Sequence, residues 1–249
     1  MKTRIHCLFL VLLSISCQKK DYKLTFEPVT YSADACAGCP VINITIPKAL
    51  EEAKIDSIIN NALKEEIIFL LNFNDDSEAT NIESAITSFT NGYTDLKSRF
   101  AEEATPWEAE LTGTLAYEDK NILTIQLDSY LFTGGAHGYS TAHFLNFDKL
   151  KAVELDNEDL FKNLADFQDF AETKFRLQEK IPAQGDINST GFMFEPNAFY
   201  LPQNIGHTQE GIQLFYEQYE IASYADGPIV LHIPYSELQD YLVYVPEQK

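Results

Sequence analysis

The spacing of apolar residues changes near residue 105, and this change predicts the order of the structural elements. Before it, apolar residues recur at intervals of three and four in segments 50–71 and 82–100, which is typical of two amphipathic helices. After it, apolar and polar residues alternate in three runs, 107–117, 123–131 and 140–147, which predicts an antiparallel meander of strands. Helices and strands that occur in separate groups are typical of the α+β class.

The remaining segments extend the same mixture toward both ends of the chain. Residues 23–46 are rich in β-branched side chains and are expected to be extended, with Pro47 ending the strand and opening the first helix. The later elements are expected, in chain order, as a helix around 164–175, a loop over 181–196, strands at 211–216 and 229–233, and a helical turn at 236–240. We therefore expect two small α+β domains, residues 23–138 and 139–249, with antiparallel sheets and helices packed on one face.

The first 17 residues have the arrangement of a bacterial export signal. Two basic residues precede an apolar stretch at 7–13, which is too short to span a bilayer, and small residues lead to a cysteine. A small residue before Cys17 resembles a lipobox, although Ser14 stands where Leu is usual. We therefore expect residues 1–16 to be a lipoprotein signal peptide and residues 17–22 a tether, with an ordinary secreted protein as the alternative.

These features predict a location in the bacterial cell envelope, either periplasmic or facing the cell surface. The partner expected there is the outer or cytoplasmic membrane, bound through the lipid on Cys17, since lipid chains contribute about 0.8 kcal/mol per buried methylene. The chain carries 38 acidic residues against 18 Lys and Arg, and loss of the signal peptide moves its formal charge from −20 to −22. A field of this sign repels phosphate backbones, which excludes nucleic acid as a partner.

After processing, two cysteines remain, Cys36 and Cys39. Such a pair has three readings: a structural disulfide, a redox dithiol, or half of a zinc site. Zinc would need a second Cys or His pair at ligand spacing, and a redox pair is expected at a helix N-terminus, whereas an extended segment follows here. For an oxidising compartment we favour the disulfide, and we expect no metal or other cofactor.

Two short motifs are the most specific marks of a family resemblance. They are the Gly-Gly-Ala-His turn that ends at His137 and the Tyr-Glu-Ile-Ala segment that begins at Tyr219. Residues 130–138, 146–148, 155–161, 219–227 and 233–238 carry the resemblance. With them the chain resembles a bacterial extracytoplasmic two-domain family of unknown function, found in the lysozyme-sensing anti-sigma factor RsiV and in the N-terminal region of the peptidoglycan deacetylase PdaC.

The resemblance implies two small α+β domains, often carried by lipoproteins or membrane-anchored chains. The chain departs from the family at Ser223, where Pro is common, and at residues 149–151, where a Thr-Gly turn is common; both are local backbone features. It shows neither a transmembrane helix with a sigma-binding segment nor a deacetylase domain, so we expect neither of those activities. What the resemblance implies is an envelope domain that binds something outside the cytoplasm.

The candidate binding residues come from these two motifs. Gly134 and Gly135 supply the positive φ of a tight turn, and His137 beside them could contact a partner or serve the turn itself. Tyr130 precedes the turn, on a strand. The second motif contributes Tyr219, Glu220 and Tyr224. Exposed tyrosines bind proteins or stack on sugar rings, whereas buried ones fill a sheet, and both readings stay open.

The sequence predicts no catalytic site. It has no Gly-x-Ser-x-Gly elbow, His-Glu-x-x-His helix or P-loop, and His143, His207 and His232 are expected to be ordinary half-buried histidines. We therefore expect a lipid-anchored binding module, recognising a cationic muramidase or a cell-wall fragment, because an acidic surface speeds encounter with a basic protein. The alternatives are a cell-wall glycan hydrolase using His137 or Glu220, and a purely structural envelope lipoprotein.

Overall fold

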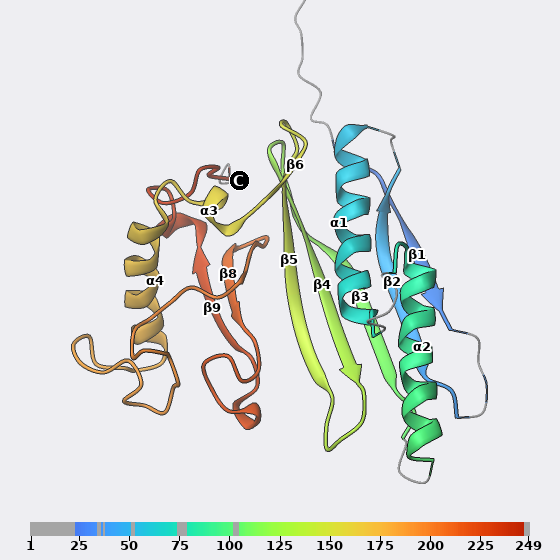
Figure 1. The fold of residues 1–249 in the computed structure, drawn as a ribbon. Coiled ribbons are helices and arrows are strands. Elements are labelled where there is room, and N and C mark those ends of the chain that lie inside the picture. Colours follow the sequence, from blue (N-terminus) through green and yellow to red (C-terminus); the bar gives the residue numbers. More distant parts are fainter. Residues whose placement is uncertain are drawn as a thin grey trace, which may run out of the picture.

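The computed structural model describes residues 23–33, 36, 38–50, 53–73, 79–101 and 105–246. It consists of a large unit built on a six-stranded sheet and a smaller unit built on a three-stranded sheet (Figure 1). The α+β class predicted from the change of period is confirmed. The predicted signal peptide, the lipid-bearing Cys17 and the tether lie outside the described residues.

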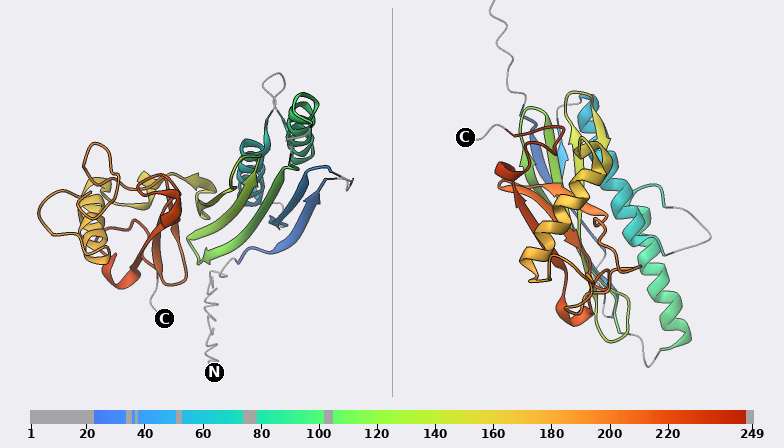
Figure 2. Two further views of the ribbon diagram at one scale, coloured as in Figure 1. Left: turned by 90° about the horizontal axis from the view of Figure 1, so that it is seen from below. Right: turned by 90° about the vertical axis from the view of Figure 1, so that its left-hand side faces the viewer.

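The large unit has strands in the order of the chain, with two helices on one face of the sheet (Figures 1 and 2). The strands are β1 (Phe26–Ser32), β2 (Val41–Ala49), β3 (Glu108–Glu118), β4 (Ile122–Phe132), β5 (Tyr139–Asp148) and β6 (Val153–Leu155), and the helices are α1 (Lys54–Leu71) and α2 (Ile82–Arg99). Strands β2 and β3 are parallel because both helices lie in the connection between them, and the other neighbouring pairs are antiparallel. The meander predicted at β3, β4 and β5 is confirmed.

The N-terminal segment differs from its prediction. Residues 23–46 do not form one extended segment but a hairpin, β1 and β2, in which Val29 pairs with Ile46. Pro47 lies within β2 and does not end it; α1 begins only at Lys54. A proline is tolerated at this place because the β2 ladder with β3 is formed by Val41 to Thr45, so the missing amide costs no bond on that side.

The core of the large unit lies between the helices and the sheet. Most of the helix residues that the spacing predicted on one apolar face are buried there, among them Ile55, Ile59, Leu63 and Ile67 of α1, and Ile82, Ala85, Ile86, Phe89 and Tyr93 of α2. Phe100, which continued the pattern after α2, is 54% exposed. The buried helix residues pack against alternate residues of β2 to β5, such as Ile44, Leu111 and Ile125. Each large side chain buried in this way contributes about 1.5–3 kcal/mol, so the apolar stripe determines which face each helix turns to the sheet.

The smaller unit packs one helix on its own sheet. Its elements are α3 (Asn157–Leu160), α4 (Leu164–Gln178), β7 (Asn204–His207), β8 (Gly211–Tyr216) and β9 (Ile229–Pro234), with short 3-10 turns η1 (Tyr224–Asp226) and η2 (Tyr235–Glu237). The predicted helix and the two predicted strands are confirmed, whereas β7 was not predicted. The predicted turn at 236–240 begins one residue earlier and ends at Glu237, as η2. Phe175 of α4 packs among Phe192, Phe194, Phe199 and Tyr216.

The sheet of the large unit continues past the predicted boundary between residues 138 and 139. Strand β5 pairs with β4 along its whole length, from Tyr139 opposite Leu131 to Asp148 opposite Ile122, and β6 pairs with β5 in turn. The predicted boundary therefore falls in a hairpin of one sheet. The second sheet begins only at Asn204, so a boundary drawn by sheets lies after Leu155.

The two units contact each other through β5 and β7. Asn146 of β5 donates its side-chain amide to the Ile205 carbonyl of β7 at 2.8 Å, and both groups are buried. Beside this bond Phe144 of β5 packs closely over Gly206, where an added Cβ would lie 2.4 Å from the ring. The smaller unit therefore covers the β5 side of the sheet face that carries no helix and leaves the side of β2 and β3 open (Figure 2).

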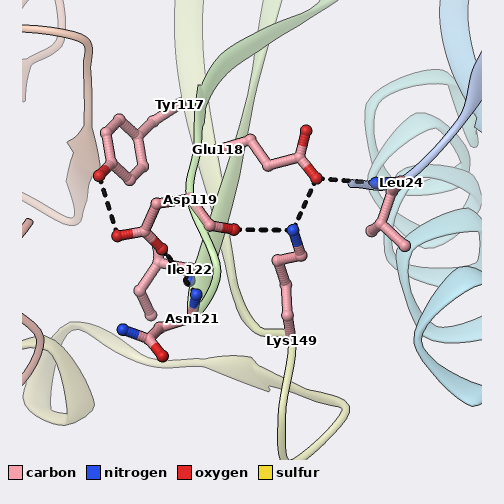
Figure 3. Close-up of polar contacts among 7 residues, drawn as sticks. All are labelled: Leu24, Tyr117, Glu118, Asp119, Asn121, Ile122 and Lys149. Carbon is pink, nitrogen blue, oxygen red and sulfur yellow. Dashed lines mark hydrogen bonds and ion pairs between the residues drawn. The ribbon is translucent and has the colours of Figure 1, made fainter. Parts of the chain in front are cut away.

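A buried polar cluster closes the end of the sheet at the β3–β4 turn (Figure 3). Lys149 donates to the carboxylate of Glu118 and to the carbonyl of Asp119, each at 2.7 Å, and only 4% and 5% of the two paired side chains is exposed. The same Glu118 oxygen accepts from the amide of Leu24 at 2.9 Å. We call Glu118, Asp119, Lys149 and Leu24 the turn cluster; it attaches the start of the described chain to the sheet.

Candidate functional site

The opposite end of the sheet carries the residues that the two sequence motifs predicted. There the β4–β5 hairpin reaches the η1 turn of the smaller unit (Figure 1). Gly134 and Gly135 have φ values of 102° and 89°, in the region that favours glycine, and a Cβ at either would have no atom within 4 Å. The two glycines therefore serve the conformation of the turn and leave space around it.

Three aromatic side chains from the two motifs meet at this end. The ring of His137 stacks on that of Tyr224, with centroids 3.7 Å apart and planes inclined by 19°. Tyr219 lies against both, with its centroid 6.5 Å from His137 and 5.5 Å from Tyr224. Its hydroxyl is 3.5 Å from His137 Nε2, and 60% of Tyr219 is exposed. We call His137, Tyr219 and Tyr224 the aromatic tip.

Bonds beneath the aromatic tip hold it in place. Tyr224 donates its hydroxyl to the Gly138 carbonyl at 3.0 Å, which joins the two units. Tyr130 of β4 packs flat beneath Gly138, since a Cβ there would lie 2.4–2.6 Å from its ring and hydroxyl. Tyr139 donates to Glu217 at 2.8 Å, and burial together with this carboxylate raises the pKa of Tyr139. The tip is thus an exposed surface on a well-bonded base.

Tyr219 adopts a backbone conformation that its residue type rarely takes. Its φ is 69°, in the left-handed region, which costs a non-glycine residue about 1–2 kcal/mol. The turn that imposes this φ is closed by Glu220, whose carboxylate accepts from the Glu217 amide at 2.8 Å. The ring of Tyr219 is exposed at this turn.

Glu220 has a local role and does not join the aromatic tip. Its carboxylate bonds within its own turn, and burial, as the main cause, raises its pKa above the ordinary value. Of the predicted residues, the structure therefore brings together His137, Tyr219 and Tyr224, places Tyr130 directly beneath them, and uses Gly134, Gly135 and Glu220 for the turns. The stacking itself had no signal in the sequence, because the two motifs are more than 80 residues apart.

A groove of about 330 Å³ runs from Tyr130 along the open face of the sheet. Side chains of β3, β4 and β5 line it, including the carboxylates of Glu110 and Asp128, and Phe215 and Pro228 of the smaller unit form one wall. Sequence reasoning missed these two acids. The alternation of apolar and polar residues places both acids on the polar face of their strands. It does not show which part of that face the smaller unit leaves open.

His143, His207 and the cysteine pair have structural surroundings, whereas His232, which was expected to be half-buried, is exposed. His143 pairs with Glu66 of α1 at 2.6 Å, and this hydrogen bond raises its pKa, whereas burial lowers the pKa of His207 to about 4. His207 is fully buried against Tyr235, contrary to the half-buried expectation. Cys36 and Cys39 are joined in a disulfide, with Cα atoms 5.3 Å apart.

Two absences among the described residues concern metals and membranes. No group of three or more His, Cys, Asp or Glu side chains in them is placed to hold a metal ion. In the same part of the chain, no helix combines the length and the apolar character needed to cross a bilayer.

Two family models match separate parts of the chain. The one described as Deacetylase PdaC matches residues 36–140, and the one described as a protein of unknown function, DUF3298, matches residues 158–236. The predicted resemblance is thereby confirmed. The first match includes the β4–β5 hairpin with His137, and the second includes Tyr219 and Tyr224, so each family segment contributes to the aromatic tip.

Solved structures share the fold over nearly the whole chain. A member of the DUF3298 family from Bacteroides fragilis has a TM-score of 0.66 and 21% identity, covering 90% of this chain and 95% of its own. A DUF3298 family protein from Pseudomonas aeruginosa has a TM-score of 0.61 and 23% identity, covering 89% and 95%. At these identities the likeness concerns the fold. No curated protein is similar enough to count as a match.

Proposed function

We propose, from the resemblance of both parts of the chain to the DUF3298/PdaC family, that this protein is a non-catalytic binding module of the bacterial cell envelope. The family resemblance supports an extracytoplasmic, envelope-associated role. The aromatic tip is the recognition surface, and its ligand is a cationic protein of the muramidase type or, as the alternative, a cell-wall fragment.

The observation that carries the proposal is the exposed aromatic tip itself. Tyrosine is enriched in protein interfaces because its ring buries a large area while its hydroxyl stays bonded. Tyr219 is 60% exposed and held outward at positive φ, and His137 and Tyr224 are stacked against each other in advance of any contact. Such preorganisation lowers the entropy cost of binding.

The charge of the molecule supports a cationic ligand. The formal net charge of −20 creates a field that attracts a basic protein from a distance and raises the association rate. This attraction is screened over about 8 Å at physiological ionic strength, so the affinity should fall with added salt.

Anchoring through Cys17 completes the proposal. Membrane-extracted protein should carry a diacylated N-terminal cysteine in mass spectrometry, and Cys17→Ser should leave the membrane fraction. Recovery of Cys17→Ser in membranes at the wild-type level would contradict the anchor without affecting the aromatic tip.

The recognition surface is tested by measuring binding of the full chain to lysozyme and to muropeptides at low and high salt. Tyr219→Ala should weaken binding at least tenfold, since it removes the most exposed ring of the tip. Phe69→Ala, an aromatic that is 78% exposed on α1, is the matched control and should bind like the wild type. Binding of neither ligand would contradict the proposal and favour the purely structural lipoprotein.

A further inference from the structure

Three segments meet at the end of the sheet that holds the turn cluster. They are the β3–β4 turn (119–121), the β5–β6 turn (149–152) and the start of the described chain at Lys23 (Figures 1 and 3). The backbone amide of Lys149 donates to the Asn121 carbonyl at 2.7 Å, so the two turns lie side by side. The bond from the Leu24 amide to Glu118 fixes the chain start beside them. We call the outer surface of these three segments the turn end.

Apolar side chains are exposed at the turn end. Leu150, in the β5–β6 turn, is 73% exposed, and Val153 directly after the turn is exposed as well. The backbone beneath Leu150 is fixed, because the amides of Leu150 and Lys151 both donate to the carboxylate of Asp148, at 2.9 and 2.8 Å. Tyr244 donates its hydroxyl to the same carboxylate at 2.6 Å. The turn therefore holds an apolar side chain outward on a bonded base.

The exposed charges of the turn end are basic, whereas its acids are bonded inward. Among the described residues of the three segments, the charged side chains that are exposed are Lys23, Lys120 and Lys151. Glu118 bonds to Lys149 and is 5% exposed, and the fully buried Asp148 pairs with Lys151, whose side chain stays 65% exposed. This end thus presents ammonium groups around an exposed leucine, on a molecule that is acidic as a whole.

The net charge of −20 does not decide what the turn end can contact. At physiological ionic strength, charges farther away than about 8 Å are largely screened. The lysines of the turn end therefore determine the local attraction to phosphate once the surface is held close to it. Long-range repulsion matters for encounter from solution, and a covalent tether removes that step.

The reach of the proposed tether selects this end of the molecule. Lys23 is six positions after Cys17, and a fully extended chain of six residues spans at most about 22 Å. Strand β4, with 11 residues, is longer, at about 35 Å, and separates the turn end from the aromatic tip. A lipid on Cys17 therefore brings the turn end to the bilayer and cannot bring the aromatic tip there in its place.

We infer that the turn end contacts the surface of an anionic lipid bilayer. Leu150 enters the boundary between headgroups and acyl chains, and Lys23, Lys120 and Lys151 lie beside lipid phosphates. The inference rests on the proposed anchor at Cys17 and goes beyond it, because it assigns a surface of the protein and an orientation. In that orientation β4 holds the aromatic tip up to about 35 Å from the lipid.

The experiment measures tryptophan fluorescence of the full chain, processed and reconstituted in vesicles of phosphatidylglycerol and phosphatidylethanolamine with brominated acyl chains. In Leu150→Trp the new emission should shift to shorter wavelength and lose about half its intensity, since an interfacial side chain lies about 5–10 Å deep, within reach of the bromines. Trp107, the one native tryptophan, is buried just before β3 at the opposite end and should not respond.

Two controls separate contact at this end from general exposure. Leu177→Trp, at a leucine that is 76% exposed in the last turn of α4, should not be quenched. Adding Lys120→Gln and Lys151→Gln to Leu150→Trp should lower the quenching roughly twofold, because each lysine near an anionic surface adds attraction. Adding Lys64→Gln and Lys180→Gln, which lie outside the turn end, should not. All variants should keep the wild-type melting temperature.

Three results would overturn the inference while leaving the anchor intact. They are vesicle-bound protein in which Leu150→Trp is not quenched, equal quenching of Leu177→Trp, and quenching that the loss of both lysines leaves unchanged. Wild-type protein that does not sediment with the vesicles would contradict the anchor, and the inference with it. Binding of lysozyme by the aromatic tip is measured separately, so its failure would affect only the proposed recognition.

Discussion

The aromatic tip and the turn cluster lie at opposite ends of the six-stranded sheet. Their polar side chains differ in burial and in hydrogen bonding. At the turn cluster, Lys149 and Glu118 are almost fully buried and bond to each other and to the backbone. At the aromatic tip, Tyr219 and His137 are exposed, and the polar contact between the two side chains is long, at 3.5 Å. A buried, bonded group indicates a structural role, whereas an exposed and weakly bonded one leaves its surface available for the partner that we propose.

The largest expected effect is at the turn cluster. Lys149→Met should lower the free energy of unfolding by about 3–5 kcal/mol, because it leaves the buried Glu118 carboxylate without its counter-charge. Urea denaturation measures this. Adding Glu118→Gln to Lys149→Met should recover most of the loss, and a double variant as unstable as the single one would show that shape, not charge, decides.

The second prediction concerns His207, whose ring lies against Tyr117 and is stacked on and hydrogen-bonded to Tyr235. Burial lowers its pKa to about 4 from 6.5, with Asp119 acting weakly in the opposite direction. Between these values the unfolded chain binds a proton that the folded chain does not, so stability falls as the pH falls from about 6.5 to about 4, by about 3 kcal/mol in total.

Urea unfolding at several pH values measures this fall in the free energy of unfolding between pH 6.5 and pH 4. The variant His207→Asn should no longer show it. His143 acts in the opposite sense, since its pKa is raised by Glu66 and its stabilisation is present below pH 6.5 and lost as the pH rises through the folded value. The pH dependence with and without His207→Asn is therefore best compared in a His143→Gln background. If His207→Asn leaves the pH dependence of the free energy of unfolding unchanged, another group titrates.

The third prediction tests the base of the aromatic tip. Gly138→Ala should cost about 1–3 kcal/mol, because the added methyl would lie 2.4 Å from the Tyr130 ring. In a Tyr130→Ala background the same change should cost much less. Gly135→Val should also destabilise, through its φ of 89°, but independently of Tyr130. Equal costs of Gly138→Ala in both backgrounds would mean that the ring moves aside freely.

The smallest expected effect on stability is at the tip itself. His137→Ala should change the melting temperature little, because its ring is exposed and its imidazole makes only long hydrogen bonds. It should nevertheless weaken lysozyme binding in the assay proposed above. A loss of about 2 kcal/mol in stability with intact binding would show that this histidine is structural and would remove the contrast between the two ends.

The sequence predicted the elements whose apolar spacing repeats over many residues, and it missed those that depend on distant contacts. Helices α1, α2 and α4 and the meander each carry an uninterrupted pattern. Strand β7 has four residues, among them Gly206, and forms because it pairs with β8 and packs against β5. The β1–β2 hairpin was not predicted, although Gly38 and Pro40 lie in its connection. The boundary at residue 138 followed a glycine turn that is internal to one sheet.

In the candidate site, too, residue types could be predicted from local sequence, whereas contacts between distant segments could not. His137 and the segment from Tyr219 to Tyr224 stand out in the sequence by their residue types. Their stacking depends on how the two units pack, which no local pattern records. The groove acids Glu110 and Asp128 look like ordinary polar positions of two strands, and only the extent of the second unit shows that they remain uncovered.

The bond between the Leu24 amide and Glu118 has a mechanical consequence. Leu24 is buried directly after the predicted tether and leads into β1, whose seven residues all pair with β2. Tension on a tethered molecule would draw β1 along its own axis, so the seven pairs would share the load instead of opening one after another. Resistance to force is set by the unfolding rate, and this geometry would keep the sheet intact while a partner pulls on the far end.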